Sequence, residues 1–128
     1  MPPRVLIIEP SPALRRTFAR TLARRGLSVQ VAGSATEALE LCAGFAPDIV
    51  IAAYHVGDEP ASEAMREIKR SHPGVVVLLT SDAFATEQTL GNIRLLPRPS
   101  EPRALLDLLR RAVTGDSLWL IRRSTVPG

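Results

Sequence analysis

The sequence predicts an α/β fold, namely a doubly wound sheet of five parallel strands with helices on both faces. Short runs rich in valine, isoleucine and leucine alternate along the chain with longer segments of helical periodicity. The short runs contain few polar residues, which is typical of strands buried on both faces of a parallel sheet. A chain of 128 residues fits one domain. Right-handed crossovers then place helices on both sides of that sheet.

The first strand and helix have clear boundaries. Arg4–Ile8 is an apolar run between prolines and is expected to form the first strand. Ser11 is suited to cap the following helix, with Pro12 at its first position. Gly26 is expected to end that helix. The apolar stripe of the helix consists of Leu14, Phe18 and Leu22.

The second and third strands follow the same pattern. Leu27–Ala32 alternates apolar and polar residues and is expected to be a strand. Ser34 and Glu37 have the spacing of a capping box, which predicts a second helix running to about Gly44. Asp48–Ala53 ends in five consecutive apolar residues and predicts the third, fully buried strand.

The rest of the chain completes the sheet. Pro60 is expected to open a third helix that ends near His72, Pro73 and Gly74. Val75–Thr80 and Ile93–Leu96 are predicted to be the fourth and fifth strands. The segment between them, Ala83–Gly91, has room for one or two helical turns. The last helix is expected from Ser100, Glu101 and Pro102 onward, with Leu105, Leu106, Leu109 and Val113 on its apolar face.

The amino-acid composition limits the classes of protein to which this chain can belong. The formal net charge of +3 is carried mostly by arginine and is weak support for nucleic-acid binding. Cys42 is the only cysteine, so an intrachain disulfide is excluded, and its apolar surroundings predict a buried structural thiol. No apolar run approaches the ~20 residues of a membrane span, and the start lacks a signal-peptide pattern. We therefore expect a cytoplasmic protein.

Four sequence stretches carry a family resemblance. They are Val5–Arg15, Pro47–Ala52, Val77–Thr80 and Leu96–Pro99. Together they resemble the receiver domain of bacterial two-component response regulators, the CheY-like family with its flavodoxin-like fold. The resemblance covers about Arg4 to Val113. It implies a receiver-like domain over residues 1–113 and a C-terminal tail over 114–128.

The resemblance implies a phosphorylation site at the carboxyl ends of the strands. Such a site uses two carboxylates after strand one, an aspartate phosphoacceptor after strand three, a hydroxyl after strand four and a lysine after strand five. The first acidic position is Glu9, and the second is Pro10, which has no side-chain oxygen. The phosphoacceptor position is Ala53. Thr80 keeps the hydroxyl, and Arg98 stands at the lysine position.

Two further departures concern the family's conformational response. The aromatic switch position is Leu95. The spacing from Thr80 to Arg98 is shorter than usual for the family, which predicts a short fourth helix between the last two strands.

These departures predict a protein that is not an enzyme and needs no cofactor or metal. Glu9 and Arg98 are expected to pair with each other when metal and phosphate are absent. Asp58 and Asp82 lie on nearby loops as weaker candidates for a substitute phosphoacceptor. His55, with Glu9 and those two aspartates, is a candidate transition-metal ligand, although a surface-loop histidine is the favoured interpretation.

The leading hypothesis is a phosphorylation-independent pseudo-receiver that binds a protein partner in a signalling pathway. The alternative is a nucleic-acid-associated regulator that uses the basic row Arg16, Arg20 and Arg24 on the first helix. A weaker third hypothesis is an enzyme or sensor that uses a small ligand in the pocket over Ala53, where the phosphoacceptor is missing. Trp119, in the apolar tail segment Leu118–Ile121, is a candidate docking residue, expected to be partly buried on its own domain or against a second copy in a homodimer.

Overall fold

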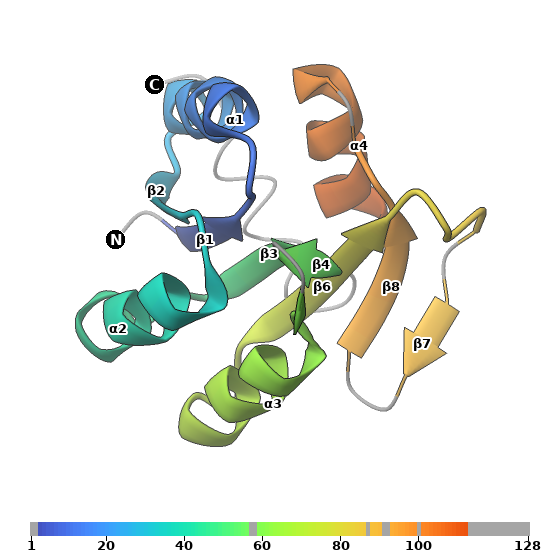
Figure 1. Cartoon of the computed structure of the whole chain (residues 1–128). Helices are drawn as coiled ribbons and strands as arrows, with labels where there is room; N and C mark the ends of the chain where they lie inside the picture. Colours follow the sequence, from blue (N-terminus) through green and yellow to red (C-terminus); the bar gives the residue numbers. More distant parts are fainter. Residues whose placement is uncertain (1–2, 57–58, 87, 91–92, 100, 113–128) are drawn as a thin grey trace.

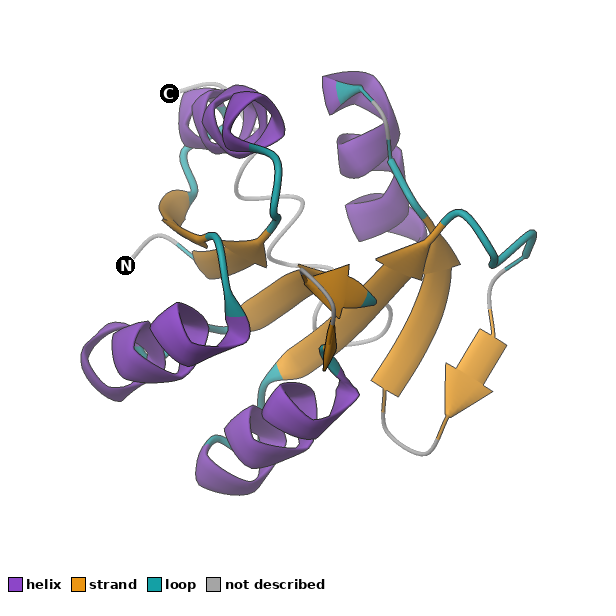
Figure 2. Ribbon diagram, viewed as in Figure 1, coloured by secondary structure: helices purple, strands orange, loops and turns teal. Residues whose placement is uncertain are grey.

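A computed structural model describes residues 3–56, 59–86, 88–90, 93–99 and 101–112. Helices lie on both faces of a central sheet, with α1 and α4 on one face and α2 and α3 on the other (Figures 1 and 2). The elements in chain order are β1 (Arg4–Ile8), α1 (Pro12–Arg24), β2 (Ser28–Ala32), α2 (Ala35–Phe45), β3 (Ile49–Ala53), β4 (His55–Val56), β5 (Glu59–Pro60), α3 (Ser62–Ser71), β6 (Val76–Ser81), β7 (Gln88–Leu90), β8 (Ile93–Pro97) and α4 (Pro102–Ala112). This alternation confirms the predicted α/β fold.

The sheet has the strand order β2-β1-β3-β6-β8-β7. Its first five strands are all parallel, which confirms the prediction of five parallel strands. The strand order reverses between β1 and β3, because β2 lies on one side of β1 and all later strands lie on the other. Doubly wound sheets place functional sites at such a switch point, outside the carboxyl ends of the strands.

The prediction of a short helix between the last two parallel strands was wrong for the residues that the structure describes there. The chain turns after β6 and then forms β7, which pairs antiparallel with β8. Gln88 lies opposite Leu95, and Leu90 lies opposite Ile93. β8 would otherwise be an edge strand with unpaired backbone groups, and β7 supplies hydrogen-bonding partners to that edge.

The third helix also differs from its predicted start. It begins at Ser62 and not at Pro60. Glu59–Pro60 instead pairs antiparallel with His55–Val56, in a stretch that the sequence suggested was loop and helix start. The backbone N–H of Ala61 donates to the carbonyl oxygen of Tyr54 at 2.6 Å, which closes this hairpin in front of the helix.

Most helix ends have the capping residues that the sequence predicts. The Ser11 and Ser34 hydroxyls accept from the third residue of their helices, as predicted. Gly26 has φ +84°, the left-handed conformation expected after α1. α2 ends at Phe45, in agreement with the predicted end at about Gly44, and Ala46 takes the left-handed conformation with φ 50°.

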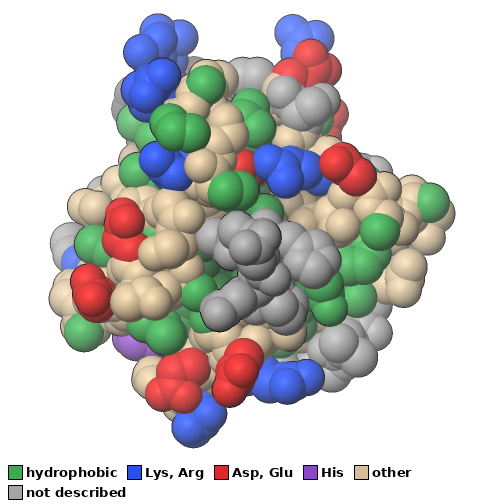
Figure 3. Space-filling model, in the orientation of Figure 1, with side chains coloured by type: hydrophobic (Ala, Val, Ile, Leu, Met, Phe, Trp, Pro, Cys, Tyr) green, Lys and Arg blue, Asp and Glu red, His purple; other side chains and the backbone are tan. Residues whose placement is uncertain are grey.

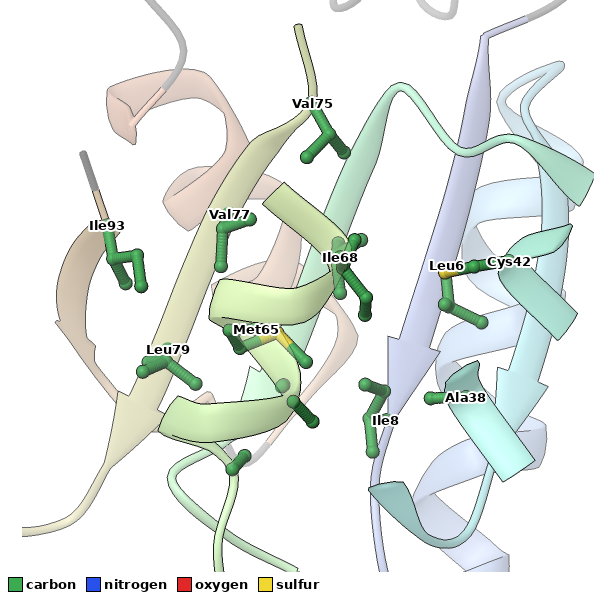
Figure 4. Close-up of a cluster of buried hydrophobic side chains, with 14 of the residues drawn as sticks. Leu6, Ile8, Ala38, Cys42, Met65, Ile68, Val75, Val77, Leu79 and Ile93 are labelled. Atoms are coloured by element: carbon green, nitrogen blue, oxygen red, sulfur yellow. The ribbon is translucent and has the colours of Figure 1, made fainter. Parts of the chain in front are cut away.

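Two apolar layers hold the helices to the sheet. One layer lies under α1 and α4, with Phe18, Leu22 and Leu105 among its buried side chains. The other lies under α2 and α3 and includes Leu6, Ile8, Met65 and Ile68 (Figure 4). Side chains from both faces of the strands therefore fix the strand ends that carry the candidate site.

Cys42 lies in the layer under α2 and α3, where its residue is only 4% exposed. This confirms the predicted buried thiol. Burial raises the pKa of the Cys42 thiol, because an apolar environment disfavours the charged thiolate.

None of the helices in the described part of the chain is long and apolar enough to span a membrane.

Candidate functional site

Four of the residues singled out in the sequence meet at the carboxyl edge of the sheet. Glu9 directly follows β1, and Ala53 is the last residue of β3. Thr80 lies on β6 directly opposite Ala53. Arg98 follows β8, and its backbone N–H donates to the carbonyl oxygen of Ser81 at 3.2 Å. The parallel register thus brings side chains from four strands to one edge.

Glu9 and Arg98 form a direct ion pair, as predicted. The Nη2 atom of Arg98 lies 2.8 Å from both Oε1 and Oε2 of Glu9. The Glu9 side chain is 6% exposed and the Arg98 side chain is 27% exposed. A nearly buried carboxylate therefore has its charge compensated by a guanidinium that keeps limited access to water.

A backbone donor completes the environment of the Glu9 carboxylate. The N–H of Ser11 donates to Oε2 of Glu9 at 2.9 Å. The N–H of Glu9 itself donates to the carbonyl oxygen of Ala32 on β2 at 3.0 Å. Both carboxylate oxygens consequently accept hydrogen bonds from the protein. A ligand or metal ion that approached them would have to compete with the guanidinium of Arg98.

A second guanidinium supports the same loop. Nη1 of Arg15 donates to the carbonyl oxygens of Glu9 at 2.8 Å and of Pro10 at 3.2 Å. A Cβ atom at Gly33 would lie 2.6 Å from this nitrogen, so the absence of a side chain at Gly33 makes room for it. Arg15 therefore fixes the loop after β1. In this loop the side chain of Pro10 is exposed.

Ala53 and Thr80 form the floor of the site. Ala53 is 3% exposed and offers only a methyl group. The Thr80 hydroxyl, also buried, donates to the carbonyl oxygen of Ala52 at 3.4 Å, a long hydrogen bond. The floor therefore contains one weakly engaged hydroxyl and no side-chain nucleophile at the end of β3.

An aromatic pair borders the site beside Ala53. The rings of Tyr54 and Phe84 meet edge to face, with centroids 5.7 Å apart and an interplanar angle of 80°. The N–H of Tyr54 donates to the carbonyl oxygen of Thr80 at 2.7 Å. Phe84 belongs to the turn after β6, where its N–H donates to the carbonyl of Ser81. The pair thus joins the end of β3 to the turn after β6.

The structure describes only some of the remaining predicted residues. Leu95 is buried on β8 within the layer under α2 and α3, and Asp82 is exposed. The arginine row of α1 is exposed. The side chains of His55 and Asp58, and all of Trp119, lie outside the described residues. Among the residues described, no three His, Cys, Asp or Glu side chains gather as metal ligands.

Sequence reasoning missed Arg15 and the aromatic pair as parts of the site. Arg15 stands four residues after the Ser11 cap, so one turn of helix returns it toward the loop after β1. That spacing, together with a glycine after β2, is a signal that was available in the sequence. Tyr54 and Phe84 are thirty residues apart in the chain, and no local pattern indicates their contact.

Comparisons with known proteins were made on the sequence and on the fold. The family profile of the response regulator receiver domain matches residues 5–109. The chain is 25% identical over 130 residues to the response regulator MprA of Mycolicibacterium vanbaalenii, a match that covers 98% of this chain and 53% of the regulator. It is 31% identical over 102 residues to the sensor kinase CckA of Brucella abortus, covering 74% of this chain and 11% of the kinase. The chain thus spans about half the length of the regulator and a small part of the kinase.

Solved structures share the fold. A CheY-like receiver domain protein from Methanospirillum hungatei has a TM-score of 0.71 and 18% identity, covering 87% of this chain and 93% of its own. The chemotaxis protein CheY4 of Vibrio cholerae has a TM-score of 0.70 and 20% identity, covering 88% of this chain and 99% of its own.

Proposed function

Since the chain belongs to the response regulator receiver domain family of two-component signalling, we propose that it is a receiver domain that works without phosphoryl transfer. In this proposal it is not an enzyme, and it acts as an interaction module for a protein of a signalling pathway. The proposal rests on one observation above all. The guanidinium of Arg98 is bound to both carboxylate oxygens of Glu9 at a strand edge where β3 ends in Ala53.

Phosphoryl transfer to a side chain needs an oxygen nucleophile in line with the donor phosphorus. Ala53 stands at the position of the phosphoacceptor and has no such oxygen. Thr80 lies opposite and has a hydroxyl, but that hydroxyl is buried and directed to the carbonyl of Ala52. Thr80 and Arg98 can only bind a phosphoryl group that another residue would have to accept.

The cation that the reaction needs is replaced by a protein side chain. Pro10, at the second carboxylate position, offers no metal ligand. Glu9, at the first, is already neutralised by Arg98 and bonded to the Ser11 amide. A magnesium ion would have only this carboxylate among the two acidic positions, and would have to displace a guanidinium from it. The electrostatic arrangement therefore favours a metal-free site.

The same contacts support a fixed conformation. In the family pattern, the cation after strand five and the hydroxyl after strand four bind the phosphoryl group, so phosphorylation joins strands three, four and five. Here Arg98 instead joins β8 to Glu9 after β1, and the Tyr54–Phe84 contact joins β3 to the turn after β6. Leu95, which replaces the aromatic switch residue, is buried. The surface offered to a partner accordingly does not depend on phosphate.

Affinity capture from the native cell tests this function. The tagged chain is used as bait with and without a small phosphodonor and Mg²⁺, and bound proteins are quantified by mass spectrometry. We expect the same signalling protein in equal amount under both conditions. The matched control is Arg103→Glu, an exposed change on α4. A partner that is retained only in the presence of the phosphodonor contradicts the proposal.

Substitutions at the site test separately the loss of the nucleophile and the loss of the second carboxylate. Ala53→Asp alone should not restore phosphorylation, because Pro10 leaves the metal site incomplete. Ala53→Asp combined with Pro10→Asp restores both the nucleophile and the second carboxylate, and should take up more phosphate than either single variant. Efficient phosphorylation of Ala53→Asp alone would show that the metal site is intact, against this account.

A further inference from the structure

The exposed face of α1 is a cationic surface. Arg16, Arg20 and Arg24 follow one another at four-residue intervals and are all exposed. The helix contains no acidic residue. Within the described part of the chain, none of the three arginines forms an ion pair. Figure 3 shows Lys and Arg side chains at the upper left of the view, where Figure 1 places α1.

Small residues separate these arginines. Ala13, Thr17 and Ala23 share the exposed side of α1 with them. The Thr17 hydroxyl donates to the carbonyl oxygen of Ala13 at 3.0 Å, so its polar group is already satisfied. A helix face of this kind can come close to a groove between two other helices, while its long side chains reach to either side.

A groove of suitable character lies between α2 and α3. Its volume is about 670 Å³, and it is lined in part by Leu39, the exposed large hydrophobic residue of the described chain at 37%. Glu63 and Glu67 line it from successive turns of α3, and Arg70 and His72, later in the sequence, also line it. Glu63 is exposed and has no ion pair among the described residues, whereas Glu67 pairs with Arg70 at 2.9 Å. α2 itself carries two glutamates and no basic residue.

We propose that α1 of one copy of this chain docks in the α2–α3 groove of a second copy. Arg20 and its neighbours in the row lie against Glu63 and Glu67, which have the same four-residue spacing. The aliphatic parts of the arginine side chains cover Leu39. The complementary charges of the two surfaces carry this inference, which does not depend on whether the receiver site is phosphorylated.

The position of the two surfaces determines the type of assembly. α1 lies on one face of the sheet, and α2 and α3 lie on the other (Figure 1). Each copy therefore offers its arginine row to one neighbour and its groove to another. Such a heterologous contact builds a head-to-tail chain or a closed ring, in contrast to a two-fold dimer.

Sedimentation velocity over a series of protein concentrations tests the association. We expect the full chain to self-associate at about 0.01 M salt, where the Debye length is about 30 Å. The association should be lost at about 1 M salt, where the Debye length is about 3 Å. A chain that remains monomeric at low salt and high concentration overturns the proposal.

Charge reversals identify the two surfaces. Arg20→Glu removes the centre of the row, and Glu63→Arg reverses the free acid of the groove. Each should raise the dissociation constant about tenfold or more. Arg103→Glu and Asp107→Arg, both on α4, are exposed controls with the same changes in net charge, and they should associate like the wild type.

Mixing the two variants provides the decisive result. The intact row of Glu63→Arg can bind the intact groove of Arg20→Glu, so the mixture should associate although each variant alone does not. No association in the mixture would refute a head-to-tail contact. The contact would also be refuted if Arg20→Glu left the low-salt assembly of the wild type unchanged. It would be refuted as well if the arginine row bound DNA while Glu63→Arg left self-association unchanged.

Discussion

Replacing Arg98 by methionine tests the electrostatic arrangement of the site. Methionine keeps an unbranched apolar stem but removes the guanidinium. The Glu9 carboxylate would then remain almost buried, with the Ser11 amide as its one remaining donor among the contacts described above. A buried charge that loses its partner is costly, because the protein no longer replaces the water that the charge has lost.

The size of the effect follows from the exposure of the two side chains. Breaking a fully buried pair costs about 3–5 kcal/mol, whereas a surface pair is worth less than about 1 kcal/mol. Glu9 is 6% exposed and Arg98 is 27% exposed, so the pair lies between these limits. We expect Arg98→Met to lower the free energy of unfolding by about 2 kcal/mol. For a domain of this size, the melting temperature should fall by about 8 °C.

Urea denaturation followed by circular dichroism measures this change. Glu9→Gln and the double variant Glu9→Gln/Arg98→Met complete a double-mutant cycle, which should give a coupling of about 1–2 kcal/mol. Arg103→Met, an exposed change on α4, is the control and should stay within about 0.5 kcal/mol of the wild type. If Arg98→Met is no more destabilising than this control, the ion pair does not hold the site together.

Three further predictions test local features. Ala46→Gly should raise the free energy of unfolding by about 1 kcal/mol in urea denaturation, because Ala46 has φ 50°, a left-handed conformation that strains alanine but not glycine. An unchanged stability would contradict this strain. Gly33→Ala should cost about 1 kcal/mol by displacing the Arg15 guanidinium, and the cost should vanish in an Arg15→Ala background. Burial raises the pKa of the Cys42 thiol, so the folded state holds this proton more tightly than the unfolded chain. Its contribution to stability should be complete below the ordinary thiol pKa and fall as pH rises through it toward the raised value, in denaturation curves compared with those of Cys42→Ala.

The parallel sheet could be predicted from sequence because its signals are local. Each buried strand is a short run of valine, isoleucine or leucine, and each early helix has a serine cap at the expected place. The Glu9–Arg98 contact could also be predicted, since both residues follow strands that end at the same edge of the sheet and carry opposite charges. These inferences need only periodicity and the topology that it implies.

The features that were missed depend on contacts between distant residues. β7 exists because Gln88–Leu90 lies beside the open edge of β8, and its own sequence is polar and short. The left-handed conformation of Ala46 after α2 also has no signal in the sequence, because alanine does not favour that conformation. The Tyr54–Phe84 pair likewise arises from tertiary packing. Propensity is a weak guide wherever packing of this kind decides the outcome.

Mass spectrometry of the intact wild-type chain, after incubation with a small phosphodonor and Mg²⁺, tests the central claim most directly. The proposal predicts an unchanged mass, because Ala53 has no accepting oxygen and Arg98 occupies the Glu9 carboxylate. The double variant Pro10→Asp/Ala53→Asp, treated in the same way, shows whether the conditions support transfer to this fold. A stable gain of one phosphoryl group on the wild-type chain would contradict the account, and its location at Asp58 or Asp82 would identify a substitute acceptor.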